Sequence, residues 1–453
     1  MVIIAKSISS ELNKNNKNHL SVLTNVIDYA IIQSLDVIDY FLIYIWKGRN
    51  KMKTKKIAAL AFSAVLAFSF LVSGCNNGGG ENIGTGTNKP SGTGTMRDMT
   101  SMELVKEMKI GWNLGDTLDV CQADRDGDGK VNEHVEEGEE VDETLWGNVM
   151  TTPELFDKLK EDGVNAVRIP VTWRDHLDDD DNIKESWMNR VQEVVDYAVE
   201  RDFYVIINMH HDGGGDPKFG AWVIENAQSD YDKFYARYSK MWKQIAERFK
   251  NYSDHLIFES LNEVGFDKIK NSQGEEEAFA LLNRINQDFV DIIRESGGNN
   301  QKRHLLIAGY WTDVAETCKP YYKMPQDKTE NRLIVSVHYY TPYEFCIVGS
   351  QKTWGSDSDV KLMTDKMNLM KKHFVDKGYP VIIGEYSGGG SNKEFIYFSE
   401  YLTKLCNDMG AACFLWDNGG NLNRKTLKWS VDGLMEALRK ATSGEDYEVK
   451  KGA

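Results

Sequence analysis

Eight short apolar runs, separated by amphipathic stretches, occupy the chain from about residue 98 to residue 442. The stretch 185–202, for example, places its apolar residues at helical spacing. Strands that alternate with helices over this length predict an α/β fold, a (β/α)8 TIM barrel forming one domain. The alternative is an open doubly wound sheet, but the turn at 111–115 lacks the glycine-rich motif of that fold. The expected strands are 109–115, 166–171, 204–210, 256–263, 304–310, 333–340, 380–386 and 411–417. The expected helices are 185–202, 231–252, 275–296, 359–377, 393–409 and 432–441, with a further helix starting at Pro153 behind the cap residue Thr152.

Two of the apolar runs end in a glutamate. The run 256–263 closes on Asn262 and Glu263, and the run 380–386 carries Glu385 near its end. A carboxylate at the end of a buried strand is costly unless it is paired or used. Because the carboxyl ends of barrel strands meet at one rim, we expect the two glutamates to face each other. Such a pair can act as acid/base and nucleophile in glycoside hydrolysis, and the alternative is two structural glutamates.

Further polar and aromatic residues fall at the ends of the expected strands. Each has a structural explanation by itself: Arg168 could form a buried ion pair, and Trp416 could belong to the core. Together they favour a cleft built for a neutral polyol. They are Asn113, Arg168, His210, His211, Asn262, His338, Tyr340 and Trp416.

The same residues lie in motifs that resemble those of glycoside hydrolase family 5, the largest cellulase family. The motifs are VRIP (167–170), NMHHD (208–212), FESLNE (258–263), VHYY (337–340), IGEY (383–386) and LWDNG (415–419). GWNLG (111–115) and ETLWGN (143–148) are most similar to subfamily 4, which contains endoglucanases, xyloglucanases and broad β-glucanases. The resemblance runs in order over about residues 98–442.

The resemblance implies a retaining endo-β-1,4-glucanase that needs no cofactor for catalysis, with Glu263 as acid/base and Glu385 as nucleophile. A xyloglucanase, a mixed-linkage β-glucanase or a mannanase would use the same catalytic set. A surface glycan-binding protein is the non-enzymatic alternative, which could lose either glutamate freely. The resemblance also implies a subsite around the cleaved bond made of Arg168, His210, Asn262, His338, Tyr340 and Trp416, with His211 as a neighbour.

The chemistry sets further expectations. Glu263 must stay protonated until it donates, so we expect the second carboxylate to raise its pKa in the free enzyme. Retention predicts carboxyl groups about 5–5.5 Å apart. Three residues depart from the family pattern, Asp116, Val264 and Leu415. Asp116 and Val264 leave open where the loops after the first and fourth strands lie.

The N-terminal region predicts export. Residues 1–51 have an interrupted apolar pattern and are interpreted as an upstream extension. Residues 52–75 combine a basic start, an uncharged apolar run and Ser-Gly-Cys, which predicts a lipoprotein signal with lipidation at Cys75. Residues 76–97 form an expected Gly/Thr/Asn-rich linker. We therefore expect a secreted protein, lipid-anchored at the bacterial cell surface or outer membrane, that contacts membrane only through this anchor.

An acidic insertion at 121–143 interrupts the family pattern within the catalytic domain, 98–445. Asp124, Asp126 and Asp128 occupy the first, third and fifth places of an EF-hand-like loop, but the twelfth place is Val135. The pattern favours a structural calcium ion over a solvated acidic loop. A catalytic metal at His210, His211 and Asp212 is disfavoured because no third ligand is signalled.

Composition limits the partners. The net charge of −15 argues against a nucleic-acid partner and is compatible with a neutral polysaccharide such as a β-glucan. The six cysteines show no Cys-x-x-Cys pair. We expect a monomer, with residues 446–453 as a C-terminal tail.

Overall fold

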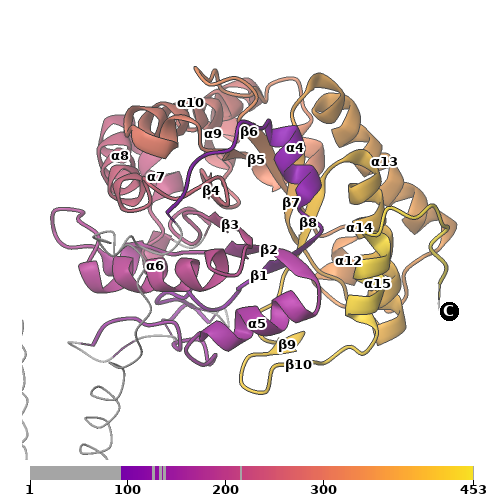
Figure 1. Cartoon of the computed structure of the whole chain (residues 1–453). Coiled ribbons are helices and arrows are strands. Elements are labelled where there is room, and N and C mark those ends of the chain that lie inside the picture. The colour runs from indigo at the N-terminus through magenta and orange to yellow at the C-terminus, as the bar shows by residue number, and fades with distance from the viewer. Residues whose placement is uncertain (1–92, 125–127, 132–134, 136–138, 215–216, 452–453) are drawn as a thin grey trace, which may run out of the picture. The chain divides into compact units, whose positions relative to one another are not determined.

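A computed structural model describes residues 93–451, apart from 125–127, 132–134, 136–138 and 215–216. Within these residues, eight parallel strands close into a barrel in which each strand pairs with the next and β8 returns to β1 (Figure 1). The predicted (β/α)8 fold is thus confirmed. The strands are β1 Ile110–Asn113, β2 Val164–Ile169, β3 Tyr204–Ile207, β4 Leu256–Glu259, β5 Leu305–Asp313, β6 Leu333–Tyr339, β7 Val381–Tyr386 and β8 Ala412–Leu415. A separate antiparallel pair joins β9 Leu422–Asn423 to β10 Lys428–Trp429.

Helices surround the barrel (Figure 1). The longer ones are α5 Pro153–Glu161, α6 Glu185–Val199, α8 Tyr231–Arg248, α10 Glu275–Glu295, α13 Asp357–His373, α14 Asn392–Met409 and α15 Leu434–Ala441. Shorter helices are α4 Ser101–Glu107, α7 Val223–Ser229, α9 Asp267–Ser272, α11 Val314–Thr317 and α12 Tyr343–Cys346. Single 3-10 turns are η1 Arg174–His176, η2 Pro217–Phe219, η3 Gly298–Gln301 and η4 Val375–Lys377.

The predicted elements lie close to the observed ones, with one informative difference. Pro153 begins α5 after the cap residue Thr152, as expected, although the Thr152 side chain makes no capping hydrogen bond to the backbone. Strand β4 ends at Glu259, whereas the sequence predicted a strand up to Glu263. Asn262 and Glu263 therefore lie on the loop that follows β4 and not on the strand itself.

The barrel interior is layered. Helix α4 places Leu104 and Val105 against the part of the barrel interior away from the carboxyl ends of the strands. There they form one apolar cluster with inward-facing strand residues. The strand residues of this cluster are Ala166, Tyr204, Ile206, Ile257, Leu306, Ile334, Ile382, Ala412 and Phe414. Four of the residues two positions further along the chain, toward the strand ends, and Asn113 of β1 are polar and buried, and we call them the polar layer: Asn113, Arg168, Asn208, Glu259 and Ser336. The polar layer forms the floor beneath the rim residues.

The ends of the described chain pack on the barrel. Arg97 lies within the predicted linker, yet its guanidinium bonds to Asp254, Tyr204 and Glu107, and Gly94 donates its backbone N–H to Asn251. Gly94 and Arg97, in the last residues of the predicted linker 76–97, thus contact the barrel domain. In the predicted tail 446–453, the Tyr447 hydroxyl donates to Glu400 of α14. Cys75 and the predicted extension, signal and most of the linker lie outside the described residues.

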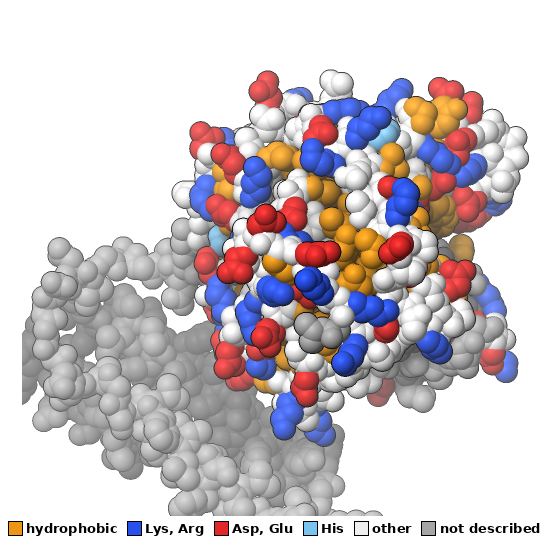
Figure 2. Space-filling model, turned by 90° about the vertical axis from the view of Figure 1, so that its right-hand side faces the viewer, with side chains coloured by type: hydrophobic (Ala, Val, Ile, Leu, Met, Phe, Trp, Pro, Cys, Tyr) orange, Lys and Arg blue, Asp and Glu red, His pale blue; other side chains and the backbone are white. Residues whose placement is uncertain are grey.

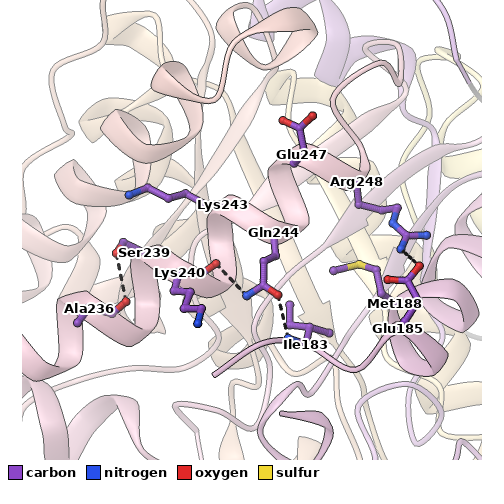
Figure 3. Close-up of a pocket in the computed structure, with 10 residues that line it drawn as sticks. All are labelled: Ile183, Glu185, Met188, Ala236, Ser239, Lys240, Lys243, Gln244, Glu247 and Arg248. Atoms are coloured by element: carbon purple, nitrogen blue, oxygen red, sulfur yellow. Dashed lines mark hydrogen bonds and ion pairs between the residues drawn. The ribbon is translucent and has the colours of Figure 1, made fainter. Parts of the chain in front are cut away.

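In the part of the chain that the structure describes, no helix has the length and apolar character needed to cross a membrane. A surface hollow of about 890 Å³ lies between α6 and α8, and Glu185, Lys243 and Arg248 are among the charged side chains around it (Figure 3). On the outer face in Figure 2, Lys and Arg side chains intermingle with Asp and Glu side chains among the described residues. Such mixing suits a solvated surface.

Candidate active site

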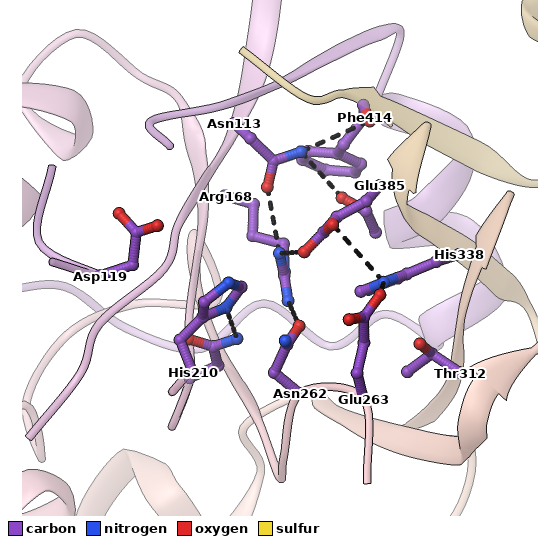
Figure 4. Close-up of polar contacts among 12 residues, drawn as sticks. Asn113, Asp119, Arg168, His210, Asn262, Glu263, Thr312, His338, Glu385 and Phe414 are labelled. Carbon is purple, nitrogen blue, oxygen red and sulfur yellow. Dashed lines mark hydrogen bonds and ion pairs between the residues drawn. The ribbon is translucent and has the colours of Figure 1, made fainter. Parts of the chain in front are cut away.

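Glu263 and Glu385 face each other at the carboxyl-terminal mouth of the barrel, with His338 between them (Figure 4). One carboxylate oxygen of each glutamate and a ring nitrogen of His338 all lie within 4.8 Å of one another. Glu385 is almost fully buried on β7, whereas the Glu263 side chain is 42% exposed on its loop. Two close carboxylates in different surroundings are a suitable arrangement for separate acid and nucleophile roles.

The loop that carries Glu263 is held in an unusual backbone conformation. Glu263 has φ 46°, in the left-handed region that non-glycine residues rarely adopt. Trp311, at the end of β5, donates its backbone N–H to Val264 and lays its indole over Gly265, where a Cβ atom would come within 2.2 Å of the indole nitrogen. Gly265 is therefore required for this close approach. Strain of this kind is kept where surrounding contacts fix a functional side chain.

Arg168 connects the polar layer to the rim. Its Nη1 donates to Glu385 Oε1 at 2.7 Å and to Asn113 Oδ1 at 3.1 Å, and its Nη2 donates to Asn262 Oδ1 at 2.8 Å. Its Nε donates to Glu259 Oε2 at 2.7 Å. The guanidinium is fully buried, and the Glu259 and Glu385 carboxylates raise its pKa against the opposing effect of burial. Arg168 is thus a fixed positive charge that orients both Glu385 and Asn262.

Tyr340 holds the second oxygen of the same carboxylate. Its hydroxyl donates to Glu385 Oε2 at 2.9 Å. Burial, reinforced by the charges of Glu385 and Glu263, raises the pKa of Tyr340 well above its usual value. The phenol therefore remains a proton donor at neutral pH, and Glu385 is held at both oxygens.

The protonation of Glu263 differs from the sequence-based prediction. His338 Nδ1 lies 2.8 Å from Glu263 Oε1 and 3.6 Å from Glu385 Oε2. Burial alone would raise the pKa of Glu263, but the hydrogen bond and charge of His338, helped by Arg168 and His211, lower it. Burial likewise disfavours a charged His338, but Glu385 and Glu263 outweigh burial and raise the pKa of His338. The expectation of a raised Glu263 pKa is therefore wrong for the free protein, because the nearest partner of Glu263 is an imidazole that can carry the proton.

The opposite wall of the site contains His210, His211 and Trp416. The His210 ring is stacked parallel to Trp416, with centroids 5.8 Å apart and an interplanar angle of 7°. The backbone carbonyl of Gly214 lies 3.0 Å from His211 Nδ1, which must therefore donate to it. Gly115 makes room for Trp416, since a Cβ atom there would come within 2.8 Å of the indole. The aromatic ring of Trp416 suits the apolar face of a pyranose, and the ring nitrogens of the two histidines suit its hydroxyl groups.

Asp119, which the sequence interpretation did not select, lies beside these histidines. It is fully buried, accepts the backbone N–H groups of Asp116 and Thr117, and lies 3.9 Å from His211 Nε2. Burial raises the pKa of Asp119 to about 7. Asp212 instead accepts hydrogen bonds from Trp222 and Trp173. Asp119, and not Asp212, is the carboxylate that lies with His210 and His211, and one ligand atom of each of these three residues lies within 4.8 Å of the others.

The structure brings together every rim residue selected from the sequence and adds others. Asn208, Glu259 and Asp119 also belong to the site, and only Asn208 and Glu259 fell within the motifs that carry the family resemblance. In the acidic insertion, Asp124 accepts the backbone N–H groups of Asp128 and Gly129, while Asp126 lies outside the described residues. The Asp128 carboxylate is also 3.5 Å from Lys130.

Comparison with known proteins gives a consistent family assignment. Residues 130–422 match the family model described as cellulase (glycosyl hydrolase family 5). The chain is 37% identical over 374 residues to the cellulase/esterase CelE of Acetivibrio thermocellus, covering 77% of this chain and 41% of the relative. It is 35% identical over 357 residues to endoglucanase A of Clostridium longisporum, covering 75% of this chain and 65% of the relative. The chain thus spans less than two thirds of each of these two relatives.

Solved structures extend the likeness to the whole barrel. One example is the GH5-4 broad specificity endoglucanase of Ruminococcus champanellensis with bound cellotriose, which is 36% identical. The superposition has a TM-score of 0.66 and covers 76% of this chain and 99% of the other.

Proposed function

The chain belongs to glycosyl hydrolase family 5, and from this membership we propose that it is a retaining endo-β-1,4-glucanase. The observation that carries the proposal is the facing pair Glu263 and Glu385, with oxygens within 4.8 Å of each other. A separation of about 5–5.5 Å between carboxyl groups leaves no room for a water between sugar and nucleophile and is typical of retention. Other proteins of this architecture perform many reactions, so the site, and not the barrel, supports the function.

In the first step Glu385 attacks the anomeric carbon of the bound glucosyl unit. A covalent bond forms between Glu385 and the sugar, the bond to the leaving oxygen breaks, and Glu263 gives its proton to that oxygen. Glu263 can receive this proton from His338 Nδ1, which already lies 2.8 Å away. Because the Glu263 side chain is partly exposed in the free protein, bound substrate would bury it further and favour its protonated form.

In the second step water replaces the departed chain. Glu263, now ionised, takes a proton from the water, whose oxygen attacks the anomeric carbon and breaks the bond to Glu385. Two inversions retain the anomeric configuration. We assign to Asn262 the sugar 2-hydroxyl, since Arg168 fixes its amide oxygen and leaves the amide nitrogen for the substrate. Trp416 and His210 would lie beneath the sugar ring.

Exposed apolar side chains follow two segments that carry or adjoin site residues, and they are compatible with a polymeric substrate. Val149 and Met150 follow Asn148, whose amide bonds to the β1 and β8 loops, and they are 40% and 47% exposed. Tyr343, three residues after Tyr340, is 59% exposed. The flat faces of β-glucan rings are apolar, so such side chains can support a chain that continues beyond the cleaved bond.

The test is product analysis on carboxymethyl cellulose, xyloglucan, lichenan and mannan, with the anomer followed by NMR on cello-oligosaccharides. Release of internal fragments with β-configured first products is expected. Initial α-configured products would contradict retention, and binding without any hydrolysis would favour the glycan-binding alternative. The relative rates on the four polymers would assign the preferred substrate.

We also propose that the protein is exported and anchored through a lipid on Cys75. The support is the basic start, uncharged apolar run and Ser-Gly-Cys sequence that precede the linker. Protein produced from Met52 in a lipoprotein-processing bacterium should incorporate labelled palmitate, and Cys75→Ser should abolish incorporation. Equal labelling of parent and variant would refute the anchor.

We also propose that the acidic insertion binds a structural calcium ion. It is supported by the spacing of Asp124, Asp126 and Asp128 and by the turn in which Asp124 already accepts two backbone N–H groups. The ion would stabilise the loop and take no part in catalysis, since Glu263 and Glu385 supply that chemistry.

A further inference from the structure

Glu259 is a second buried carboxylate of the polar layer, below the reacting pair. It is the last residue of β4 and is fully buried. Its Oε2 accepts from Arg168 Nε at 2.7 Å and from Asn208 Nδ2 at 3.0 Å, and its Oε1 accepts from Ser336 Oγ at 2.7 Å. Strands β2 and β6 and the residue that follows β3 thus each supply one donor to this carboxylate. Arg168 Nε and Asn208 Nδ2 can only donate, so both contacts need an acceptor oxygen on Glu259.

The first consequence concerns Arg168. Its guanidinium lies between two carboxylates, Glu259 on Nε and Glu385 on Nη1. Without Glu259, the whole positive charge of the guanidinium would act on Glu385, which would become a poorer nucleophile. With Glu259 in place, one positive charge is shared between two negative ones, so the site keeps a net negative charge. The Nε contact also fixes the plane of the guanidinium, which directs Nη2 to Asn262.

The second consequence concerns His210. The orientation of the Asn208 amide is determined on both sides, because Val171 N–H can only donate to its oxygen and Glu259 can only accept from its nitrogen. The amide nitrogen is therefore the group that lies 3.2 Å from His210 Nδ1. Because Asn208 donates to Nδ1, Nδ1 is the acceptor and the proton of the neutral ring lies on Nε2. Burial lowers the pKa of His210 well below its usual value, so the ring is neutral.

We propose that Glu259 is a positioning residue of the hydrolytic reaction, which fixes Arg168 between two carboxylates and, through Asn208, fixes His210 as an Nε2–H donor to the sugar. This inference rests on the proposed glycosidase function. It makes Glu259 an electrostatic part of the site, whereas a purely structural role would require only its hydrogen bonds.

Two variants separate charge from shape. Glu259→Gln keeps the shape: its oxygen can accept from Arg168 and Asn208, and its nitrogen can donate to Ser336. It removes one negative charge from a buried site that also contains Arg168, His210, Glu263, His338, Tyr340 and Glu385. Glu259→Asp keeps the charge but is one methylene shorter.

The expected result for the Gln variant is a loss of about 10–100-fold in kcat, with a smaller change in KM. Its kcat/KM–pH profile should move to lower pH by on the order of one unit, since positive charge nearby favours loss of protons. The Asp variant should lose rate without this shift.

A matched control lies at the other end of the barrel. Asp327 pairs with Arg294 through two hydrogen bonds of 2.9 and 2.7 Å, and both side chains are 5% exposed. Asp327→Asn removes one carboxylate charge from a buried arginine pair, as Glu259→Gln does. It should lower the melting temperature and leave the pH profile in place.

The outcomes are distinct. If Glu259→Gln folds, stays within twofold of the parent in kcat and keeps the parent pH profile, the inference is overturned. If that variant does not fold, Asn208→Ala decides, because it removes the link from Glu259 to His210, together with the acceptor of the Val171 N–H, and keeps the Glu259 contacts with Arg168 and Ser336. A loss of about tenfold in kcat/KM supports the inference, and an unchanged value overturns it. If the parent protein hydrolyses no β-glucan, the proposed function fails first, before any variant is compared.

Discussion

Replacing Glu263 by glutamine tests the assignment of the acid/base most directly. The substitution preserves the size of the side chain. Glu263 Oε1 lies 2.8 Å from His338 Nδ1, and the amide oxygen of glutamine can accept a hydrogen bond from this nitrogen in the same place. Because the side chain is 42% exposed and on a loop, the free energy of unfolding should change by no more than about 0.5 kcal/mol. The variant loses the carboxyl group that transfers the proton, together with its negative charge beside His338.

The magnitude follows from the role of that proton. General acid catalysis contributes about 10²–10⁴-fold, which corresponds to about 2.7–5.4 kcal/mol of transition-state stabilisation. We expect at least about a 10³-fold loss of kcat/KM on a β-glucan, whose leaving alkoxide needs the proton. An aryl cellobioside with an acidic phenol as leaving group needs little protonation, so its kcat/KM should fall far less. Both rates are measured by reducing-sugar release and by phenol absorbance.

The comparison of leaving groups makes the test specific. Glu276→Gln, an exposed change on α10, is the matched control and should leave both rates unchanged. Near-parental activity of Glu263→Gln on the polymer would refute the assignment. An equal loss on polymer and aryl substrate would show that the substitution damages the site as a whole and does not simply remove an acid.

Three further outcomes are expected. Glu385→Gly should lose at least about 10³-fold in turnover, and azide should restore turnover of an activated substrate by replacing the nucleophile; no rescue would argue against Glu385 in this role. His176, buried against Trp187 with its pKa lowered to about 3 by burial, binds a proton more readily in the unfolded chain, so its contribution to stability is complete above about pH 6.5 and is lost as the pH falls from there toward 3. His176→Phe should therefore stabilise the protein at pH 5 relative to pH 8 by up to about 2 kcal/mol in denaturant titrations, and an identical difference between the two pH values in parent and variant would contradict this. Millimolar calcium should raise the melting temperature, because a hundredfold excess over Kd adds about 2.7 kcal/mol to the free energy of unfolding. An equal shift in the Asp126→Ala, Asp128→Ala variant would place the ion elsewhere.

The sequence alone determined the barrel and the identity of the rim residues. Apolar runs and helical spacing are local properties, so all eight strands could be predicted within a few residues. Glu263 and Glu385 were selected because a carboxylate at the end of a buried strand requires a reason, and barrel topology places all such ends at one rim. The family motifs contributed the remaining rim residues in the same order along the chain.

Only the tertiary structure decided how these residues act on one another. Glu259 and Glu263 are four positions apart in one apolar run, and the sequence does not show that β4 ends at the first and that the second lies on a strained loop. Asp119 lies beside His211 across 92 positions of sequence, outside any motif that marks it. The protonation of Glu263 depends on His338, 75 residues away, and a pKa responds to the charges and burial around a group in space. Closing the barrel brings distant strands together at one rim, and that contact determines which group holds the proton.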